Sequence, residues 1–239
     1  MVEQSLRNKT CLITEPARGM GRGWPLAALE RPGVHEFLGE RGANRAAALS
    51  LLLCGAASLP GAAEGRLVWV QTSAATRRWG MPCGEGLNAI GLNPRNMLFV
   101  EPENERELLW ALEQALDCPG LLAVVGCLPG AERHYGFTAS RRLSLRALRN
   151  GSRIFLARGA RIREATSAQT RWRVEPAPSA PSGLAWRGFE LPGARSWRVG
   201  LERAPGWTPG AWNIEWSEHE NRLRLAASPA RANPVRAAG

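Results

Sequence analysis

Residues 35–47 read HEFLGERGANRAA: an apolar, strand-like segment, a turn containing glycine, and the start of an alanine-rich helix. This order follows the frame G-x-x-x-x-G-K-[ST], a loop whose backbone N–H groups surround phosphates, whose Lys reaches the outer phosphates and whose hydroxyl binds Mg²⁺. With Gly39 at the first glycine, Gly42 lies within the loop, and Asn44, Arg45 and Ala46 stand at the second glycine, the lysine and the hydroxyl. The frame of a phosphate loop is present, but most of its working residues are not.

Each of the three replacements weakens nucleotide binding in a different way. Asn44 tolerates a positive φ, but its side chain takes up space beside the phosphate path. Arg45 keeps the charge in a longer planar group, which is not a conservative change at a tight site, and Ala46 cannot contact a metal. Chance remains the alternative, because a chain with 26 Gly contains many such spacings. Because a strand precedes this turn and a helix follows it, we interpret the segment as a relic phosphate loop.

The composition excludes several classes of protein. An apolar content of 44% and a charged content of 22% in 239 residues are typical of a globular chain. No apolar run approaches the roughly 20 residues that span a membrane, and residues 1–9 lack the apolar core of a signal peptide. The five cysteines form no C-x-x-C pair, and the three histidines are far apart. We therefore expect a reduced, cytoplasmic protein without a metal or other cofactor.

The charge is strongly positive and comes almost entirely from arginine. The formal net charge is +10, and Lys9 is the one lysine among 31 basic residues. Arginine binds phosphate in a bidentate manner and stacks on bases, which favours nucleic acid, although a GC-rich genome gives the same bias. Ten Trp often neighbour Arg, as in Arg171-Trp172-Arg173. Such pairs could stack on bases, but we favour core packing with the arginines on the opposite face.

The middle of the chain alternates strands with helices. Short apolar runs predict strands at residues 66–71, 96–100, 121–125 and 153–157, and apolar stripes predict helices at 103–116 and 138–148. This alternation is typical of an α/β layer with a mainly parallel sheet. We interpret Glu36, Glu101 and Glu103 as helix-end or surface charges. No Ser/His/Asp or Cys/His grouping stands out, so a hydrolase or metalloenzyme is the least favoured class.

The pattern of apolar and polar residues changes after about residue 168. Alternating apolar and polar residues at 170–175, 196–202, 211–216 and 222–226 predict antiparallel strands at the sheet edge, and residues 176–183 predict a loop. Four regions follow: a flexible arm at 1–23, an α/β core at 24–168, an antiparallel β extension of the core sheet at 169–227 and a disordered tail at 228–239.

The order of these elements resembles the RecA-type ATPase core, and the details resemble the ImuA family, RecA-like accessory proteins of bacterial mutagenic translesion synthesis. The resemblance covers about residues 34–226 and implies a RecA-like, three-layer core. Its matching segments are HEFLG at 35–39, VWV at 68–70, LLWALEQAL at 108–116, TASRRL at 138–143, TRWRV at 170–174, WRVGL at 197–201 and WNIEW at 212–216.

The same resemblance implies lost catalysis. A RecA-type ATPase carries a catalytic glutamate after the second core strand and a metal-binding acid at the end of the third. Here residues 71–73 are Gln-Thr-Ser and residues 126–127 are Gly-Cys. Phosphoryl transfer depends on metal and charge stabilisation, so we expect a degenerate ATP site and no enzymatic activity.

The resemblance also points to two loops that face DNA in RecA. They correspond to residues 129–136 and 158–167 here, and their arginines could neutralise phosphates. A solvated, Arg-rich surface loop is the alternative. The candidate DNA or partner contacts are Arg141, Arg142, Arg158, Arg161, Arg163, Arg171 and Arg173.

Resemblance to the ImuA family implies a scaffold role in DNA-damage-induced mutagenesis. The implied partner is an ImuB-like protein, an inactive relative of lesion-bypass polymerases, and through it an error-prone replicative-type DNA polymerase. RecA itself and DNA are further candidate partners, and no membrane is involved. Two alternatives stay open: an active ATP-dependent RecA-type recombinase and a cell-division inhibitor resembling SulA.

Overall fold

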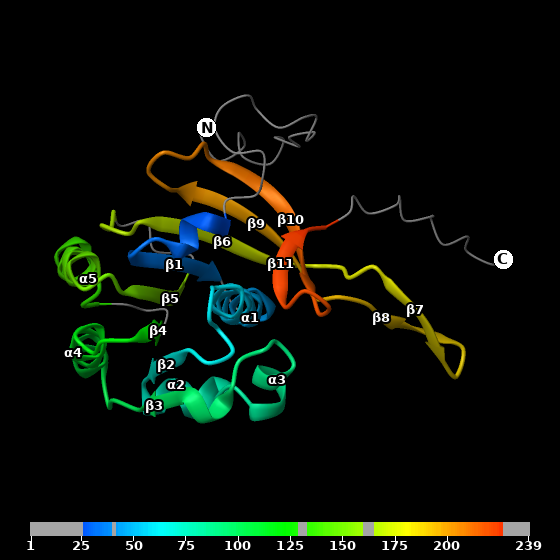
Figure 1. Ribbon diagram of the computed structural model, residues 1–239, viewed down its shortest axis with the longest axis horizontal. Helices are drawn as coiled ribbons and strands as arrows, with labels where there is room; N and C mark the ends of the chain where they lie inside the picture. The colour runs from blue at the N-terminus through cyan, green and yellow to red at the C-terminus, as the bar shows by residue number, and fades with distance from the viewer. Residues whose placement is uncertain (1–25, 40–41, 129–132, 160–164, 227–239) are drawn as a thin grey trace.

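The computed structural model describes residues 26–39, 42–128, 133–159 and 165–226. Within these ranges one large sheet has the order β11-β10-β9-β6-β1-β5-β4-β2-β3 (Figure 1). The six strands from β6 to β3 are parallel, and β9, β10 and β11 extend the sheet in antiparallel fashion. The predicted α/β class, with a mainly parallel sheet and added antiparallel strands, is confirmed. The strands are β1 (Gly33–Gly39), β2 (Arg66–Gln71), β3 (Met97–Val100), β4 (Leu121–Cys127), β5 (Arg153–Gly159), β6 (Thr170–Ala177), β9 (Ser196–Arg203), β10 (Gly210–Ser217) and β11 (Arg222–Leu225).

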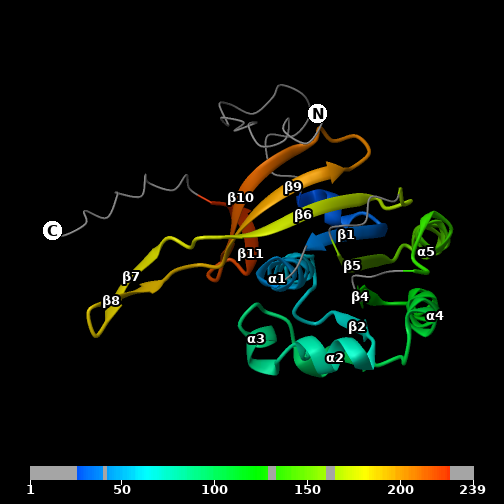
Figure 2. The same cartoon turned by 180° about the vertical axis from the view of Figure 1, so that it is seen from behind.

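Helices cover both faces of the parallel strands (Figures 1 and 2). Helix α1 packs on β1, β5 and β6 from one side, while α4 and α5 pack on the other. Alternation along β1 supplies both layers, because Phe37 joins the core under α1 and Val34 joins the core under α4 and α5. The helices are α1 (Ala43–Ala57), α2 (Ser73–Trp79), α3 (Gly84–Asn88), α4 (Glu105–Leu116) and α5 (Phe137–Arg149), with 3₁₀ turns η1 (Leu26–Glu30) and η2 (Pro94–Asn96).

The predicted strands and helices of the middle region are confirmed at nearly the expected bounds. Local chemistry explains where α4 begins: the Asn104 side chain accepts a hydrogen bond from the Glu107 N–H, and the Glu107 carboxylate accepts one from the Glu103 N–H. Its buried stripe of Leu108, Leu109, Leu112 and Leu116 then fixes which face meets the sheet.

Three features of the fold differ from the sequence prediction. Strand β6 pairs in parallel with β1 and is antiparallel only to β9, so it belongs to both halves of the sheet. Only residues 178–180 of the predicted loop at 176–183 lie outside strands, because β6 continues to Ala177 and a hairpin, β7 (Pro181–Trp186) and β8 (Phe189–Pro192), begins at Pro181. The short helices α2 and α3 were not predicted. The predicted arm at 1–23 and tail at 228–239 lie outside the described residues.

The tryptophans divide between core and surface. Trp69, Trp172, Trp197 and Trp216 are buried, which confirms core packing for these four. Trp186, on the hairpin, is 60% exposed. The core tryptophans of the antiparallel strands anchor β6, β9 and β10 against α1 and thereby attach the second half of the sheet to the first.

His35 is completely buried within β1 and forms a defined hydrogen-bond chain. Its Nε2–H donates to the Arg31 carbonyl at 2.9 Å, because a carbonyl can only accept. Its Nδ1 therefore accepts from the Thr170 hydroxyl at 2.9 Å, and that hydroxyl accepts from the Trp172 indole N–H at 2.7 Å. Burial, with Arg153 nearby as a smaller cause, lowers the pKa of His35 from 6.5 to about 4.

This burial predicts acid sensitivity. The unfolded chain takes up a proton at His35 below pH 6.5, whereas the folded chain does so only near pH 4. Stability from neutral His35 is therefore complete above pH 6.5 and falls as the pH drops towards 4, by about 3 kcal/mol in total. Urea unfolding at several pH values should show a shallower pH slope for His35→Gln than for the wild type. His219→Gln, at an exposed position, is the control, and equal slopes for wild type and His35→Gln would contradict this account.

Candidate functional site

The end of β1 lies very close to the start of α1. A Cβ on Gly39 would lie 2.4 Å from the Asn44 carbonyl oxygen and 2.8 Å from the Arg45 Cα, so only glycine allows the helix to begin this close to the strand. Gly42, the residue before α1, has a φ of 48°. Asn44 is half-buried and Ala46 is exposed. Residues 40 and 41 lie outside the described part of the chain.

Arg45 contacts other parts of the protein. The residue is buried, and its guanidinium stacks over the Trp79 ring of α2 at 3.8 Å from the ring centroid. It also donates a hydrogen bond through Nη2 to the carbonyl of Leu128, directly after β4. A cation–π contact and a charge-assisted hydrogen bond therefore hold the side chain of Arg45, the residue that we aligned with the lysine of the phosphate-loop frame.

The strand ends beside this loop carry neutral residues. At the end of β2, Gln71 is buried, accepts from the Trp69 indole N–H and donates to the Gly80 carbonyl. At the end of β4, a Cβ on Gly126 would lie 2.6 Å from a Leu156 methyl group. Cys127 is also buried, and burial raises the pKa of its thiol to about 12. The described residues that end β2 and β4 are therefore packed within the protein core.

A buried ionic cluster lies on the other face of the sheet, and we call it the Glu36 cluster: Glu36, Tyr135, Arg158 and Arg171. One carboxylate oxygen of Glu36 accepts from Arg158 Nη1 at 2.8 Å and from the Tyr135 hydroxyl at 2.9 Å. The other oxygen accepts from Arg171 Nε at 2.8 Å. The interpretation of Glu36 as a helix-end or surface charge is wrong, because its side chain is 0% exposed.

The cluster joins segments that are far apart in the sequence. Glu36 lies on β1, Arg158 on β5 and Arg171 on β6, and Tyr135 precedes α5. The Arg158 guanidinium also lies over the Tyr135 ring, 4.5 Å from its centroid. Arg171 donates a hydrogen bond to the Thr166 hydroxyl, and the backbone carbonyl of Thr166 accepts a hydrogen bond from Arg203. Of the two loops that were predicted to face DNA, the one at 129–136 is attached to this cluster through Tyr135, and the one at 158–167 is attached through Arg158 and Thr166.

The structure does not bring the predicted arginine contacts onto one surface. Arg158 is buried and Arg171 is partly buried, and both bind Glu36. Arg173 pairs with Glu202 on the open sheet face. Arg141 and Arg142 are both exposed on α5, and Arg142 pairs with Glu113 of α4. Arg161 and Arg163 lie outside the described residues.

Sequence reasoning missed the Glu36 cluster, although a signal was present. Residues 33–39 form a short strand in which Glu36, the single carboxylate, stands at the centre beside His35. A charge at such a position needs a buried partner, since lone buried carboxylates are costly. The arginines at 158 and 171 each follow or lie within an apolar strand. What the sequence lacked was the strand order that places both next to β1.

The burial of this cluster predicts a large effect of a small substitution. Glu36→Gln keeps the shape of the side chain but removes the charge that Arg158 and Arg171 share, so we expect a loss of about 3–5 kcal/mol in unfolding free energy. Glu202→Gln, which breaks the partly exposed pair with Arg173, should cost less than about 1 kcal/mol. Urea titration at pH 7 measures both. Equal costs for the two variants would show that the buried cluster is not a major source of stability.

Two general findings accompany these sites. In the part of the chain that the structure describes, no group of three or more His, Cys, Asp or Glu side chains could hold a metal ion. No helix in those same ranges is long and apolar enough to cross a membrane.

Comparison with known proteins identifies a relative over nearly the whole chain. No family model matches the sequence. Protein ImuA of Caulobacter vibrioides is 29% identical over 236 residues, which cover 91% of this chain and 88% of that protein. The protein of the same name from a second strain of this species matches equally well. With this similarity along both chains, the present chain is an ImuA-like protein.

Proposed function

We propose that this chain is a non-catalytic, RecA-like accessory protein in DNA-damage-induced mutagenesis, with a degenerate ATP site and a scaffold role. In this proposal it binds an ImuB-like relative of lesion-bypass polymerases and, through that partner, serves an error-prone replicative-type DNA polymerase. RecA and DNA are further candidate ligands. Similarity to Protein ImuA supports the biological setting of the proposal.

The contacts of Arg45 are the observation that carries the non-catalytic part of the proposal. In a working phosphate loop the corresponding lysine points to the outer phosphates. Arg45 instead stacks on Trp79 and binds the Leu128 carbonyl. A phosphate would have to displace both contacts, in a loop that also lacks the Mg²⁺-binding hydroxyl.

The neutral strand ends support the same conclusion. The residues that end β2 and β4 are Gln71 and Cys127, and neither can hold Mg²⁺ or activate water as a carboxylate does. Gln71 is occupied by Trp69 and Gly80, and Cys127 is a buried neutral thiol. The alternative of an active recombinase would need these groups to be supplied from elsewhere.

The proposal predicts no ATP turnover. Purified protein with radiolabelled ATP and Mg²⁺ should release no phosphate above background, with or without single-stranded DNA. Arg45→Ala should leave this result unchanged but lower the unfolding free energy by about 1–3 kcal/mol, because it removes the stacking on Trp79 and the bond to Leu128. DNA-stimulated turnover that Arg45→Ala abolishes would establish an active ATPase and overturn the proposal.

The scaffold role predicts direct binding to the polymerase-like partner. Purified ImuB-like protein from the same organism should bind the wild-type chain with a Kd of micromolar or tighter by calorimetry. Arg45→Ala should bind it equally well if the old nucleotide site has no part in the contact. Absence of binding, both alone and with single-stranded DNA, would refute the scaffold role.

A further inference from the structure

The hairpin β7–β8 carries four of the ten large apolar side chains that are exposed among the described residues. It leaves the body between β6 and β9, and Figures 1 and 2 show it extending away from the sheet and all helices. Every residue of both strands is exposed. Leu184, Trp186 and Phe189 are 65%, 60% and 74% exposed, and Leu191 is 39% exposed.

Three of these apolar side chains, Trp186, Phe189 and Leu191, share one face of the hairpin. Trp186 and Phe189 are directly paired across the strands. Because side chains alternate along a strand, Leu191 lies on the same face as these two aromatics, whereas Leu184 lies in the stretch where the register of the two strands shifts, between Pro181 and Ala185. The paired residues Ala185 and Glu190 lie on the opposite face. The hairpin is therefore amphipathic, although no part of the described chain covers its apolar face.

The shape of the hairpin is well defined by its sequence. The two residues of its turn, Arg187 and Gly188, have φ values of 49° and 83°, as a two-residue hairpin turn of type I′ requires. At its base, the Gly193 N–H donates to the Ala180 carbonyl, and the β6–β9 ladder continues to the pair Ala177 and Ser196. The turn and the bond at the base define the direction in which the hairpin leaves the main sheet.

The size of the apolar face argues for a macromolecular partner. From their exposed fractions, the four exposed apolar side chains of the hairpin together offer roughly 500 Å². Patches of this size on a monomer commonly mark interaction sites. Two copies pairing face to face would bury about 1,000 Å² at most, which is below the ~1,200 Å² of small specific interfaces. Two chains of net charge +10 would also repel each other, so a second copy is disfavoured.

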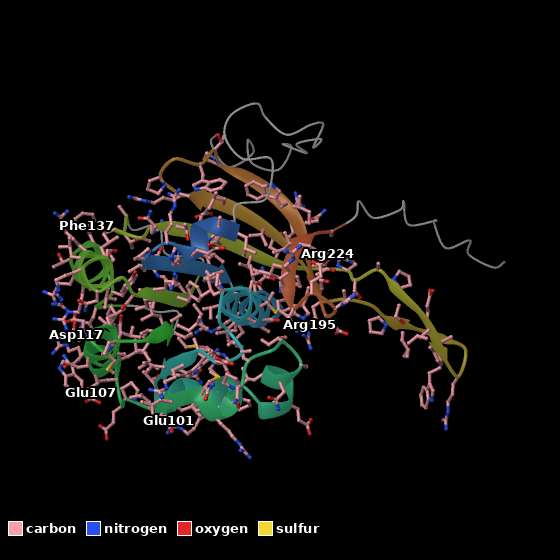
Figure 3. All side chains as sticks on the ribbon, in the orientation of Figure 1. Glu101, Glu107, Asp117, Phe137, Arg195 and Arg224 are labelled. Atoms are coloured by element: carbon pink, nitrogen blue, oxygen red, sulfur yellow. The ribbon has the colours of Figure 1, made fainter. Side chains whose placement is uncertain are left out.

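Charge distribution narrows the chemistry of that partner. Residues 181–192 contain one Arg and one Glu, and Arg187 lies over the Trp186 ring at 4.6 Å from its centroid. A neutral, apolar arm is poorly suited to DNA phosphates. At its base, Arg195 and Arg198 are exposed and form no ion pair within the described residues. Figure 3 shows Arg195 and Arg224 on the side of the body from which the hairpin extends.

We propose that the β7–β8 hairpin is the docking arm for the protein partner of the complex, inserting Trp186 and Phe189 into a concave apolar groove with an acidic rim. The apolar face fills the groove, and Arg195 and Arg198 meet the rim. A concave site is favoured because it would cover both the apolar face and the unpaired edges of the two strands. This inference rests on the proposed scaffold function and assigns it a surface.

The test compares two faces of the same hairpin. Binding of the purified ImuB-like protein is measured by calorimetry for the wild type, for the double variant Trp186→Ser/Phe189→Ser and for Ala185→Ser on the opposite face. We expect the double variant to raise Kd at least about 30-fold and Ala185→Ser to change it less than about two-fold. Thermal unfolding should be unchanged in both variants, because the arm lies outside the core. Arg195→Glu should weaken binding and reduce its dependence on salt.

The outcomes separate the two proposals. If the wild type binds and the double variant binds equally well, the hairpin is not the docking arm, while the scaffold function stands. If the wild type does not bind, the scaffold function fails, and the docking arm fails with it. Light scattering that shows a wild-type dimer lost in the double variant would assign the arm to a second copy and overturn the inference. Sedimentation of the wild type, but not the double variant, with phospholipid vesicles would overturn it in favour of a lipid surface.

Discussion

The buried charge of Glu36 is the constraint on which the parallel part of this structure depends. A carboxylate in the middle of a strand that is buried along its full length can be stable only if cations reach it inside the protein. Arg171 meets it directly across the β1–β6 pairing, and Arg158 reaches it from two residues beyond its β5 neighbour Leu156. A slip of one residue in β1 would turn Glu36 into the apolar core under α1. The cluster therefore specifies strand register as well as contributing contacts.

On both faces of the sheet, arginine side chains bind groups of the protein itself. On one face Arg158 and Arg171 hold a carboxylate, and on the other Arg45 holds a carbonyl and an aromatic ring. Each group could serve an anionic ligand if it were free, but each is bound within the protein. Under the proposed function this is the expected result when a nucleotide-binding fold retains its architecture and loses its ligand. The charges then stabilise the fold and the loops connected to it.

The positions of most strands and helices could be predicted from the sequence, whereas the direction and order of the strands in the sheet could not. Long apolar or amphipathic segments such as β4 and α4 are specified by local patterning, so their positions were correct. The direction of β6 was not predictable, because alternating residues look the same in parallel and antiparallel pairs. Glu36 was misread for a related reason: its environment depends on residues more than 100 positions away, which only the strand order brings together. The hairpin was missed because its strands contain Pro and Gly, which favour a loop assignment.

Part of the positive charge of the chain is engaged in ion pairs within the protein. Arg142 and Arg146 pair with Glu113 and Asp117 between α4 and α5, and Arg173 and Arg224 each pair with a glutamate on a neighbouring strand. Much of the arginine in the described ranges thus holds elements together, which weakens the case for a broad DNA-binding surface. A net charge of +10 still sets up a long-range field that attracts any acidic partner. Because a field selects for charge and not for shape, specificity must come from a neutral, shaped feature, and the amphipathic hairpin is such a feature.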